Sequence, residues 1–215
     1  PPGRSNDKSG SSNQKHQCIE CPPGSYANNI GAIKCELCKP GRYGSTKGAT
    51  QMNSACKICE PGRFAPMEGK GMECSLCPPG RKCPKYGTGD PMQCEAGTYN
   101  NRNGQKKCFE CPIGKYVSAN GSAVCDDCPS GKYLNKTGAD SVTQCVDCDK
   151  GSSAEVGSGL CSNCSEGYYQ DKKGQRKCIE CLFVRERERE RRDCSVHVDR
   201  IRDRIRYNSS LDFSS

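Results

Sequence analysis

Cysteine is the residue type in this chain whose number and spacing could support chemistry. The 215 residues include 21 cysteines, and most of these form nine Cys-x-x-Cys pairs. Cysteines at this spacing suit structural disulfides, a zinc site built from thiolates, or thiol–disulfide exchange. The pairs are Cys18/Cys21, Cys35/Cys38, Cys56/Cys59, Cys74/Cys77, Cys108/Cys111, Cys125/Cys128, Cys145/Cys148, Cys161/Cys164 and Cys178/Cys181, with Cys83, Cys94 and Cys194 outside them.

Catalysis finds little support in the residues. A reactive Cys-x-x-Cys pair needs a lowered thiol pKa, typically from a helix N-terminus in a βαβ unit, and no segment resembles that unit. The only histidines, His16 and His197, each lie in an irregular polar stretch. Asp126 and Asp127 could contribute to calcium binding, but a solvated acidic spacer is the simpler interpretation. We therefore expect no catalytic residue, no enzymatic activity and no cofactor.

The composition shows that the cysteines must hold the chain together. Hydrophobic residues make up 33% of the sequence even with cysteine and tyrosine counted, and there is no tryptophan. So small an apolar content cannot offset the conformational entropy of an ordered chain without covalent or metallic support. Cysteine at this density is typical of small exported modules in oxidising compartments. The sequence therefore predicts an extracellular or cell-surface location.

The charge and hydropathy patterns narrow the range of possible binding partners. The net charge of +8 comes from basic residues scattered through the loops, whereas nucleic-acid binding needs a compact patch with stacking aromatics. No apolar run approaches the roughly 18 residues of a membrane span. Because the chain begins Pro1-Pro2-Gly3, we expect a fragment of a longer exported protein, attached to a membrane only through other parts.

The cysteine pairs are positioned by an internal repeat of roughly 16 to 21 residues, present in ten copies. Each copy begins with x-x-Gly, continues with a short polar loop, and all but one end in Cys-x-x-Cys. The copies, numbered here as repeats 1 to 10, cover 1–21, 22–38, 39–59, 60–77, 78–94, 95–111, 112–128, 129–148, 149–164 and 165–181. We group them as a truncated repeat (1–21), cysteine-rich repeats with a variant copy at 78–94 (22–94), and further cysteine-rich repeats (95–181).

The glycines and the aromatic residue at fixed positions predict the conformation of each copy. The third residue is always glycine, which indicates a positive φ, and Pro23-Gly24 suits the central positions of a type II turn. Two residues further on, most copies have an aromatic that can lie on the neighbouring disulfide, as at Tyr26. A second glycine in the loop indicates the return of a short hairpin. The predicted fold is an elongated rod of small disulfide-rich repeats, built from short β-hairpins and coil loops with little helix before residue 182.

The segment 182–215 lies outside the repeat. Arginine and glutamate alternate from Arg185 to Arg191. One interpretation is a solvated charged helix, because Arg and Glu meet at i,i+3 spacing. The other is an artefact of the gene model, since a GA dinucleotide repeat encodes strict Arg-Glu alternation.

Two disulfide connectivities are compatible with the spacing. In the crossed alternative, Cys18 pairs with Cys35 and Cys21 with Cys38. Otherwise each repeat is a loop closed by its own ends, and Cys18, the odd cysteine, is left with a partner expected before residue 1. That pairing is Cys21/Cys35, Cys38/Cys56, Cys59/Cys74, Cys77/Cys83, Cys94/Cys108, Cys111/Cys125, Cys128/Cys145, Cys148/Cys161, Cys164/Cys178 and Cys181/Cys194.

Zinc is the competing chemistry. Four thiolates from successive pairs, as in Cys18, Cys21, Cys35 and Cys38, approach the spacing of a zinc ribbon. An odd number of pairs and the two unpaired cysteines of the variant copy argue against it. Four N-glycosylation sequons also favour export, at Asn120, Asn135, Asn163 and Asn208.

The repeat Cys-x-x-Cys-Pro-x-Gly-x-Tyr, followed by Gly and the next Cys-x-x-Cys, resembles the ephrin-receptor-like cysteine-rich repeats. These are similar in style to the tumour-necrosis-factor-receptor and growth-factor-receptor cysteine-rich modules. The resemblance spans residues 1–181 and implies an array of disulfide loops in the extracellular part of a large surface or secreted protein. We expect a stiff spacer or a receptor-like surface that binds an extracellular protein or a glycan; the alternative is an intracellular zinc protein. No metal ligand is expected in the favoured interpretation.

Overall fold

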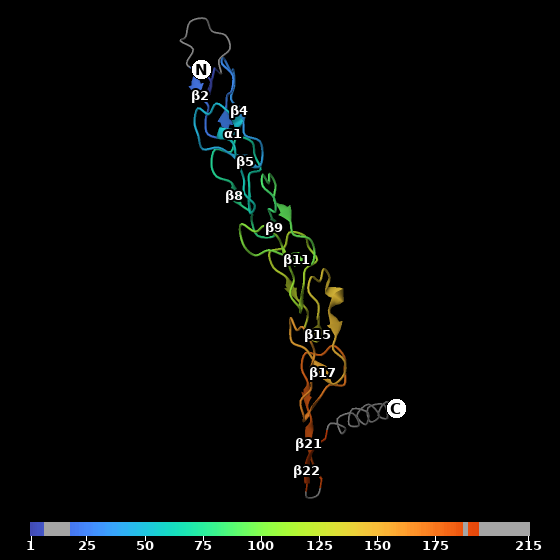
Figure 1. Ribbon diagram of the computed structural model, residues 1–215. Helices are drawn as coiled ribbons and strands as arrows, with labels where there is room; N and C mark the ends of the chain where they lie inside the picture. The colour runs from blue at the N-terminus through green and yellow to red at the C-terminus, as the bar shows by residue number, and fades with distance from the viewer. Residues whose placement is uncertain (7–17, 187–188, 194–215) are drawn as a thin grey trace, which may run out of the picture. The chain divides into compact units, whose positions relative to one another are not determined.

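The computed structural model describes residues 1–6, 18–186 and 189–193, with the backbone alone considered from 182 onward. The chain divides into two compact units. Unit 1 comprises Pro1–Glu110 with Val117–Cys125, and unit 2 comprises Cys111–Tyr116 with Asp126–Ser215. The same short hairpin recurs along both units (Figure 1).

Each repeat contains one antiparallel pair of two-residue strands. The first strand follows the turn glycine, and the second lies immediately before the last cysteine of the copy. In unit 1 the pairs are β1 (Arg4–Ser5) with β2 (Ile19–Glu20), β3 (Ser25–Tyr26) with β4 (Glu36–Leu37), β5 (Arg42–Tyr43) with β6 (Lys57–Ile58), β7 (Arg63–Phe64) with β8 (Ser75–Leu76), β9 (Arg81–Lys82) with β10 (Met92–Gln93), and β11 (Thr98–Tyr99) with β12 (Phe109–Glu110). In unit 2 they are β13 (Lys115–Tyr116) with β14 (Asp126–Asp127), β15 (Lys132–Tyr133) with β16 (Val146–Asp147), β17 (Ser152–Ser153) with β18 (Ser162–Asn163), and β19 (Tyr168–Tyr169) with β20 (Ile179–Glu180).

The turn glycine starts each hairpin. In repeat 2 Gly24 has φ +83°, and the N–H of Ser25 donates to the carbonyl of Pro22 at 3.1 Å. This is the i to i+3 hydrogen bond of a β-turn, with glycine in the left-handed corner where a side chain would be strained. A positive φ holds for the turn glycine of every repeat, which confirms the sequence prediction.

Two single helical turns take up the extra residues of the longer loops. The α1 helix (Met52–Ala55) lies in the loop closed by a disulfide with a sequence separation of 18. The 3-10 turn η1 (Val142–Gln144) lies in a loop with a separation of 17, and Ser141 Oγ accepts from the N–H of Thr143. The prediction of small disulfide-rich repeats with little helix is therefore confirmed.

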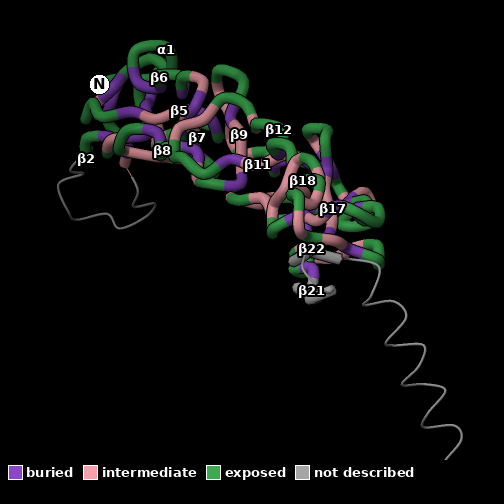
Figure 2. The backbone as a smooth tube through the Cα atoms, turned by 90° about the horizontal axis from the view of Figure 1, so that it is seen from below, coloured by how far each residue is buried: buried purple, intermediate pink, exposed green. Residues whose placement is uncertain are grey.

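Burial is confined to short stretches between exposed loops, as Figure 2 shows. The cysteines form most of it. The aromatics contribute as expected where they can be followed, because Tyr26 packs in a cluster with Cys38 of its own repeat and Cys56 of the next. A second buried position, which the sequence analysis did not identify, is the residue directly after the first strand of the repeat. It is occupied by Ala27, Ala65, Cys83, Asn100, Val117, Leu134, Ala154 and Gln170.

Backbone hydrogen bonds tie each repeat to the next one and to the one after that. Gly80 of repeat 5 donates its N–H to the carbonyl of Asn100 in repeat 6, at 2.7 Å. The N–H of Gly121 in repeat 7 reaches back two repeats to the carbonyl of Cys94, also at 2.7 Å. The same two-repeat bond joins Gly48 to Cys21, Gly69 to Cys38, Gly87 to Cys59 and Gly104 to Cys77 in unit 1, and Gly138 to Cys111, Gly157 to Cys128 and Gly174 to Cys148 in unit 2. The loop glycine thus serves contacts between repeats as well as the return of its own hairpin.

After the last repeat the chain forms one more hairpin. Strand β21 (Leu182–Glu186) pairs antiparallel with β22 (Arg189–Asp193), and its register places Arg185 opposite Glu190. The helical interpretation of the Arg-Glu stretch is therefore wrong for these residues, because alternation of period two gives opposite charges across a β-ladder as readily as along a helix. In the described part of the chain, no helix is long and apolar enough to cross a membrane.

Candidate functional site

The chemistry of the chain is concentrated in a series of disulfides that close the loops of successive repeats. Eight disulfide bonds can be assigned to their cysteines, and the Cα atoms of each bonded pair lie between 5.5 and 6.0 Å apart. They follow the pairing in which each loop is closed by its own ends, and the crossed alternative is not formed. The bonds are Cys21–Cys35, Cys38–Cys56, Cys59–Cys74, Cys77–Cys83, Cys94–Cys108, Cys128–Cys145, Cys148–Cys161 and Cys164–Cys178.

The remaining cysteines fall into three groups: bonded, free, and outside the described residues. Cys111, Cys125 and Cys181 are also disulfide-bonded. Cys18 is free and exposed. Cys194 lies outside the described residues, as do His16, His197 and Asn208, so the proposed partner of Cys181 stays a prediction.

The thiolates of the alternative zinc site do not come together. Cys21 and Cys38 are bonded to Cys35 and Cys56 respectively, and Cys18 stands alone. A thiolate site would need these sulfurs reduced and converging on one point. Among the described residues, no group of three or more His, Cys, Asp or Glu side chains is placed to hold a metal ion.

The extra cysteine of the variant repeat occupies the buried position directly after the first strand. Cys83 follows β9 and is fully buried, where repeats 2 and 4 have Ala27 and Ala65. Its bond to Cys77 spans only six residues of sequence. The ten-residue loop beyond it is held instead by the Arg81 side chain, which donates from Nη1 to the carbonyl of Pro91 at 2.9 Å.

In repeats 1 to 9 the residue after the turn glycine stabilises its hairpin in one of two ways. A long cation reaches across, as when Arg63 Nη1 donates to the carbonyl of Cys74 at 2.8 Å or Lys132 Nζ pairs with Asp147 at 2.6 Å. Lys115 pairs with Asp127 in the same manner, so one carboxylate of the candidate calcium pair is already engaged. Elsewhere a hydroxyl takes over the turn, as at Ser25, whose Oγ donates to Pro22 at 2.7 Å. The basic residues at this position are therefore local hairpin partners.

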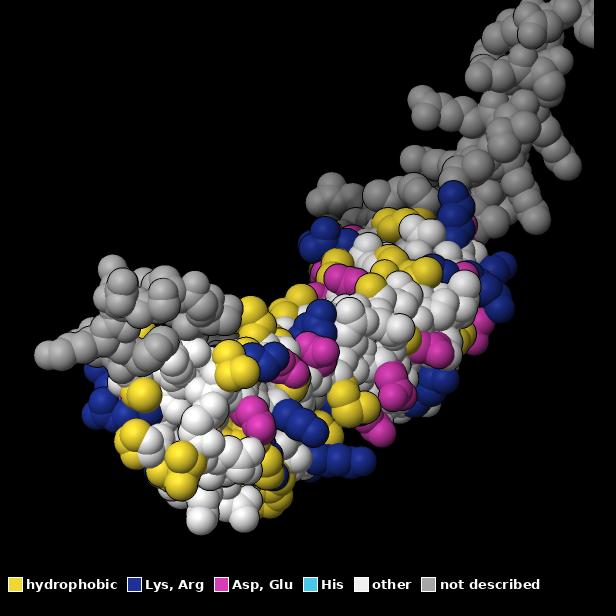
Figure 3. Space-filling view, turned by 90° about the horizontal axis from the view of Figure 1, so that it is seen from above, with side chains coloured by type: hydrophobic (Ala, Val, Ile, Leu, Met, Phe, Trp, Pro, Cys, Tyr) yellow, Lys and Arg dark blue, Asp and Glu magenta, His cyan; other side chains and the backbone are white. Residues whose placement is uncertain are grey.

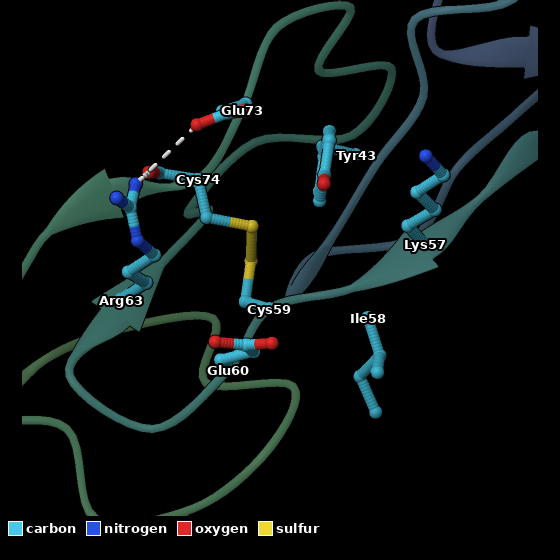
Figure 4. A pocket seen from close by; sticks show the side chains of 8 residues that line it. All are labelled: Tyr43, Lys57, Ile58, Cys59, Glu60, Arg63, Glu73 and Cys74. Atoms are coloured by element: carbon cyan, nitrogen blue, oxygen red, sulfur yellow. Dashed lines mark hydrogen bonds and ion pairs between the residues drawn. A yellow bond between two sulfur atoms is a disulfide. The ribbon is translucent and has the colours of Figure 1, made fainter.

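A shallow hollow of about 520 Å³ lies where the hairpin of repeat 3 meets repeat 4 (Figure 4). The Cys59–Cys74 disulfide lies at its centre, and Arg63 and Glu73 form an ion pair at 3.7 Å across one side. Lys57 and Glu60 add one charge of each sign, so the hollow presents no net charge to a ligand. The full lining is Tyr43, Lys57, Ile58, Cys59, Glu60, Arg63, Glu73 and Cys74.

A second hollow, of about 390 Å³, occupies the equivalent place between repeats 9 and 10. Asn163 and Tyr168 stand there where repeats 3 and 4 have Ile58 and Arg63. Because the place recurs while its side chains change, repeat geometry creates these hollows, and no ligand chemistry is shared between them. The lining is Ser153, Glu155, Ser162, Asn163, Cys164, Ser165, Tyr168, Arg176, Lys177 and Cys178.

Two polar pairs have perturbed ionisation. The hydroxyl of Tyr26 donates to Glu36 at 2.6 Å, and this hydrogen bond, with burial and the carboxylate charge, raises the pKa of Tyr26 above 10.0. On the surface of unit 2, Lys173 lies 2.7 Å from Asp149. Their hydrogen bond and mutual attraction lower the pKa of Asp149 and raise the pKa of Lys173. Tyr26 and Glu36 lie on the paired strands β3 and β4, Asp149 and Lys173 lie in repeats 9 and 10, and none of the four lines either hollow described above.

Large apolar side chains on the surface are scattered. In unit 1 Ile30, Met67 and Met72 are each more than 70% exposed. On the face seen in Figure 3, apolar side chains occur in small groups separated by Lys, Arg, Asp and Glu. No single extended apolar patch gathers on that face.

Three of the predicted sequons can be placed. Asn120, Asn135 and Asn163 are all exposed, in repeats 7, 8 and 9. Sequence reasoning missed the fully buried Asn100, whose Nδ2 donates to the carbonyl of Arg81 at 2.7 Å and whose Oδ1 accepts from the N–H of Arg102. The signal was available, because small or apolar residues recur at that position in other repeats.

Comparison with known proteins agrees with this architecture. A family model described as tyrosine-protein kinase ephrin type A/B receptor-like matches residues 8–54, 97–145 and 151–193. The matches together cover more than half of the chain, and the third includes the hairpin of β21 and β22. No curated protein matches the chain. Repeats of this family together with the dense disulfides point to an extracellular or cell-surface, receptor-like domain. The chain belongs to the ephrin type A/B receptor-like family of cysteine-rich repeats.

Proposed function

We propose that the array acts as a stiff spacer in the extracellular part of a larger surface or secreted protein. The observation that carries this proposal is that backbone hydrogen bonds join a repeat both to the next repeat and to the one after that. Within unit 1 the loop glycine of each repeat from 3 to 7 is hydrogen-bonded to a cysteine carbonyl two repeats earlier, as Gly121 is to Cys94. A contact that skips a repeat resists bending at the repeat between, because bending would break it.

Disulfides make this stiffness independent of a large core. Each loop of about 15 residues closed by a disulfide gains roughly 3 kcal/mol in the chain-entropy model. Because the backbone hydrogen bonds among the described residues reach no further than two repeats, stability adds up along the array and the number of repeats can set its length. A spacer needs these two properties and no ligand site.

A protein-binding or adhesion surface is the second candidate. Exposed apolar residues of unit 1 favour it, with Ile30 at 83% and Met72 at 77% exposure. Such side chains are common at interfaces, although scattered ones are also normal on monomers. The balanced charges of the hollow around Cys59–Cys74 do not select a ligand class.

Binding measurements separate the two functions. The purified, oxidised chain is titrated against extracellular matrix proteins, glycan arrays and intact cells, with single repeats disrupted in turn. A spacer shows no saturable binding, and every repeat variant behaves alike. Saturable affinity that resides in one or two repeats would defeat the spacer proposal and establish the binding surface.

A further inference from the structure

The three described sequons differ in how the fold holds them, although all three asparagines are exposed. They lie on successive repeats, whereas the stretch 18–119 contains no sequon. An asparagine can be modified only if its Nδ2 is accessible and its segment can enter a transferase site. The backbone around each one therefore decides which are usable.

The side-chain amide of Asn120 is hydrogen-bonded through its oxygen, and its nitrogen is left accessible. Its Oδ1 accepts a hydrogen bond from the N–H of Ala96 at 2.9 Å. Among the described residues its Nδ2 has no hydrogen-bond partner. A sugar joined to Nδ2 leaves Oδ1 free to keep the Ala96 contact, so modification and folding are compatible.

Asn135 lies in the loop that follows β15. The buried side chain of Leu134 anchors the chain directly before it, while Asn135 and Lys136 are both exposed. The Cys128–Cys145 loop is one of the longest in the array, with a separation of 17, and Asn135 is well removed from both ends. This sequon can stay open during and after oxidation.

Asn163 is held differently, because it belongs to strand β18 between two oxidised cysteines. Cys161 is bonded to Cys148, and Cys164, the middle residue of the sequon itself, is bonded to Cys178. The register pairs Asn163 with Ser152 across the hairpin. Once these bonds form, the sequon cannot leave the hairpin to enter an enzyme.

We propose, resting on the extracellular function proposed above, that Asn120 and Asn135 carry N-linked glycans and that Asn163 is glycosylated only in competition with closure of the Cys164–Cys178 disulfide. The donor is an oligosaccharide linked to a polyprenyl diphosphate. Asn Nδ2 attacks the anomeric carbon, a C–N bond forms, the C–O bond to the diphosphate breaks, and Nδ2 loses one proton. Glycans are bulky and solubilising, so they would shield repeats 7 and 8 and leave repeats 2 to 6 bare.

The test expresses the full chain behind a cleavable secretion signal in eukaryotic cells, with protein taken from both medium and cell lysate. An amidase that releases N-glycans converts each glycosylated asparagine to aspartate, which peptide mass spectrometry reads site by site. We expect aspartate at 120 and 135 throughout and a mixture of asparagine and aspartate at 163. The double variant Cys164→Ser/Cys178→Ser keeps a sequon and should shift residue 163 to aspartate alone.

The double variant Cys94→Ser/Cys108→Ser is the control and should leave the mixture at 163 unchanged. Unconverted Asn120 and Asn135 in oxidised, secreted protein would overturn the glycan proposal while leaving the extracellular function intact. Complete conversion of Asn163 in the unaltered chain would overturn the competition. A chain whose cysteines stay reduced in the lysate would contradict the extracellular function instead, and the same conversion assay still reads its glycans.

Discussion

The turn glycine Gly80 lies against the backbone of Gly121, two repeats further along the chain. A Cβ built on Gly80 would lie 2.0 Å from the carbonyl oxygen of Gly121, which is far inside van der Waals contact. The same close approach links Gly24 to Gly69 and Gly114 to Gly157 within their units, so this glycine serves turn geometry and repeat packing together. Substitution of Gly80 is therefore a direct way to test whether this contact stiffens the array.

Gly80→Ala should open the contact between repeats 5 and 7. The left-handed backbone at φ +75° strains alanine by roughly 1–2 kcal/mol, and each inter-repeat hydrogen bond lost adds about 1 kcal/mol. We expect the free energy of local opening to fall by about 3 kcal/mol. Native-state hydrogen exchange at the amides of Gly121 and Asn100 measures it.

Gly151→Ala is the matched control for this substitution. Gly151 is also a turn glycine, with φ +77°, but nothing lies within 4 Å of a Cβ built on it. Only the backbone strain remains, so a loss of about 1–2 kcal/mol is expected. Equal losses at Gly80 and Gly151 would show that the close approach contributes nothing.

Asn100→Ala should destabilise repeat 6 despite the alanines that occupy this position elsewhere. The substitution leaves the carbonyl of Arg81 and the N–H of Arg102 without their side-chain partner. Unsatisfied buried groups typically cost about 1–3 kcal/mol. Faster hydrogen exchange at Arg102, with unchanged exchange near Gln170, is the expected result. Unaltered protection at Arg102 would mean that water replaces the amide.

Removal of different disulfides should cost different amounts. Cys128→Ala/Cys145→Ala frees a loop with a separation of 17 and should cost about 3 kcal/mol, whereas Cys77→Ala/Cys83→Ala, with a separation of 6, should cost about 2 kcal/mol. Alanine already fills the position of Cys83 in other repeats, so little packing is lost there. Pulse proteolysis of each variant ranks them. The reverse ranking would show that native contacts outweigh loop closure.

The Tyr26–Glu36 pair predicts a pH dependence in the alkaline range. The hydrogen bond raises the pKa of Tyr26 in the folded chain above its unfolded value near 10.0. Its contribution to stability is therefore fully present below pH 10.0 and is lost as the pH rises through the folded-state pKa. Glu36→Ala should lower that pKa, as read by NMR of isotope-labelled tyrosine, and Glu60→Ala should not. A Tyr26 pKa unchanged in Glu36→Ala would show that burial alone perturbs it.

Much of the local architecture was readable from sequence because single residues dictate it. Gly24 requires its turn, and the regular cysteines require a stapled repeat. Spacing alone left two connectivities open, and only spatial placement of Cys21 beside Cys35 distinguishes them. The contact of Gly80 with Gly121 was not predictable, because no pattern within one repeat reports on a neighbour two repeats away.

Two errors of omission and interpretation have physical causes. Asn100 was overlooked because it is polar, although most other repeats have a small or apolar residue at its position. A helix was one of two interpretations of the Arg-Glu stretch, because charge pairing fits i,i+3 spacing. In the structure the described residues of this stretch belong to β21 and β22 instead, and the backbone register pairs Arg185 with Glu190.

The distribution of distances across several repeats of unit 1 tests the spacer most directly. Spin labels are introduced as non-canonical amino acids at the exposed positions Ile33 and Met92, in repeats 2 and 5, and their separation is measured by pulsed electron resonance. A stiff array predicts one narrow distribution that broadens in Gly41→Ala, because Gly41 packs against Gly87 between the labels. A broad distribution in the oxidised, unaltered chain would contradict the account.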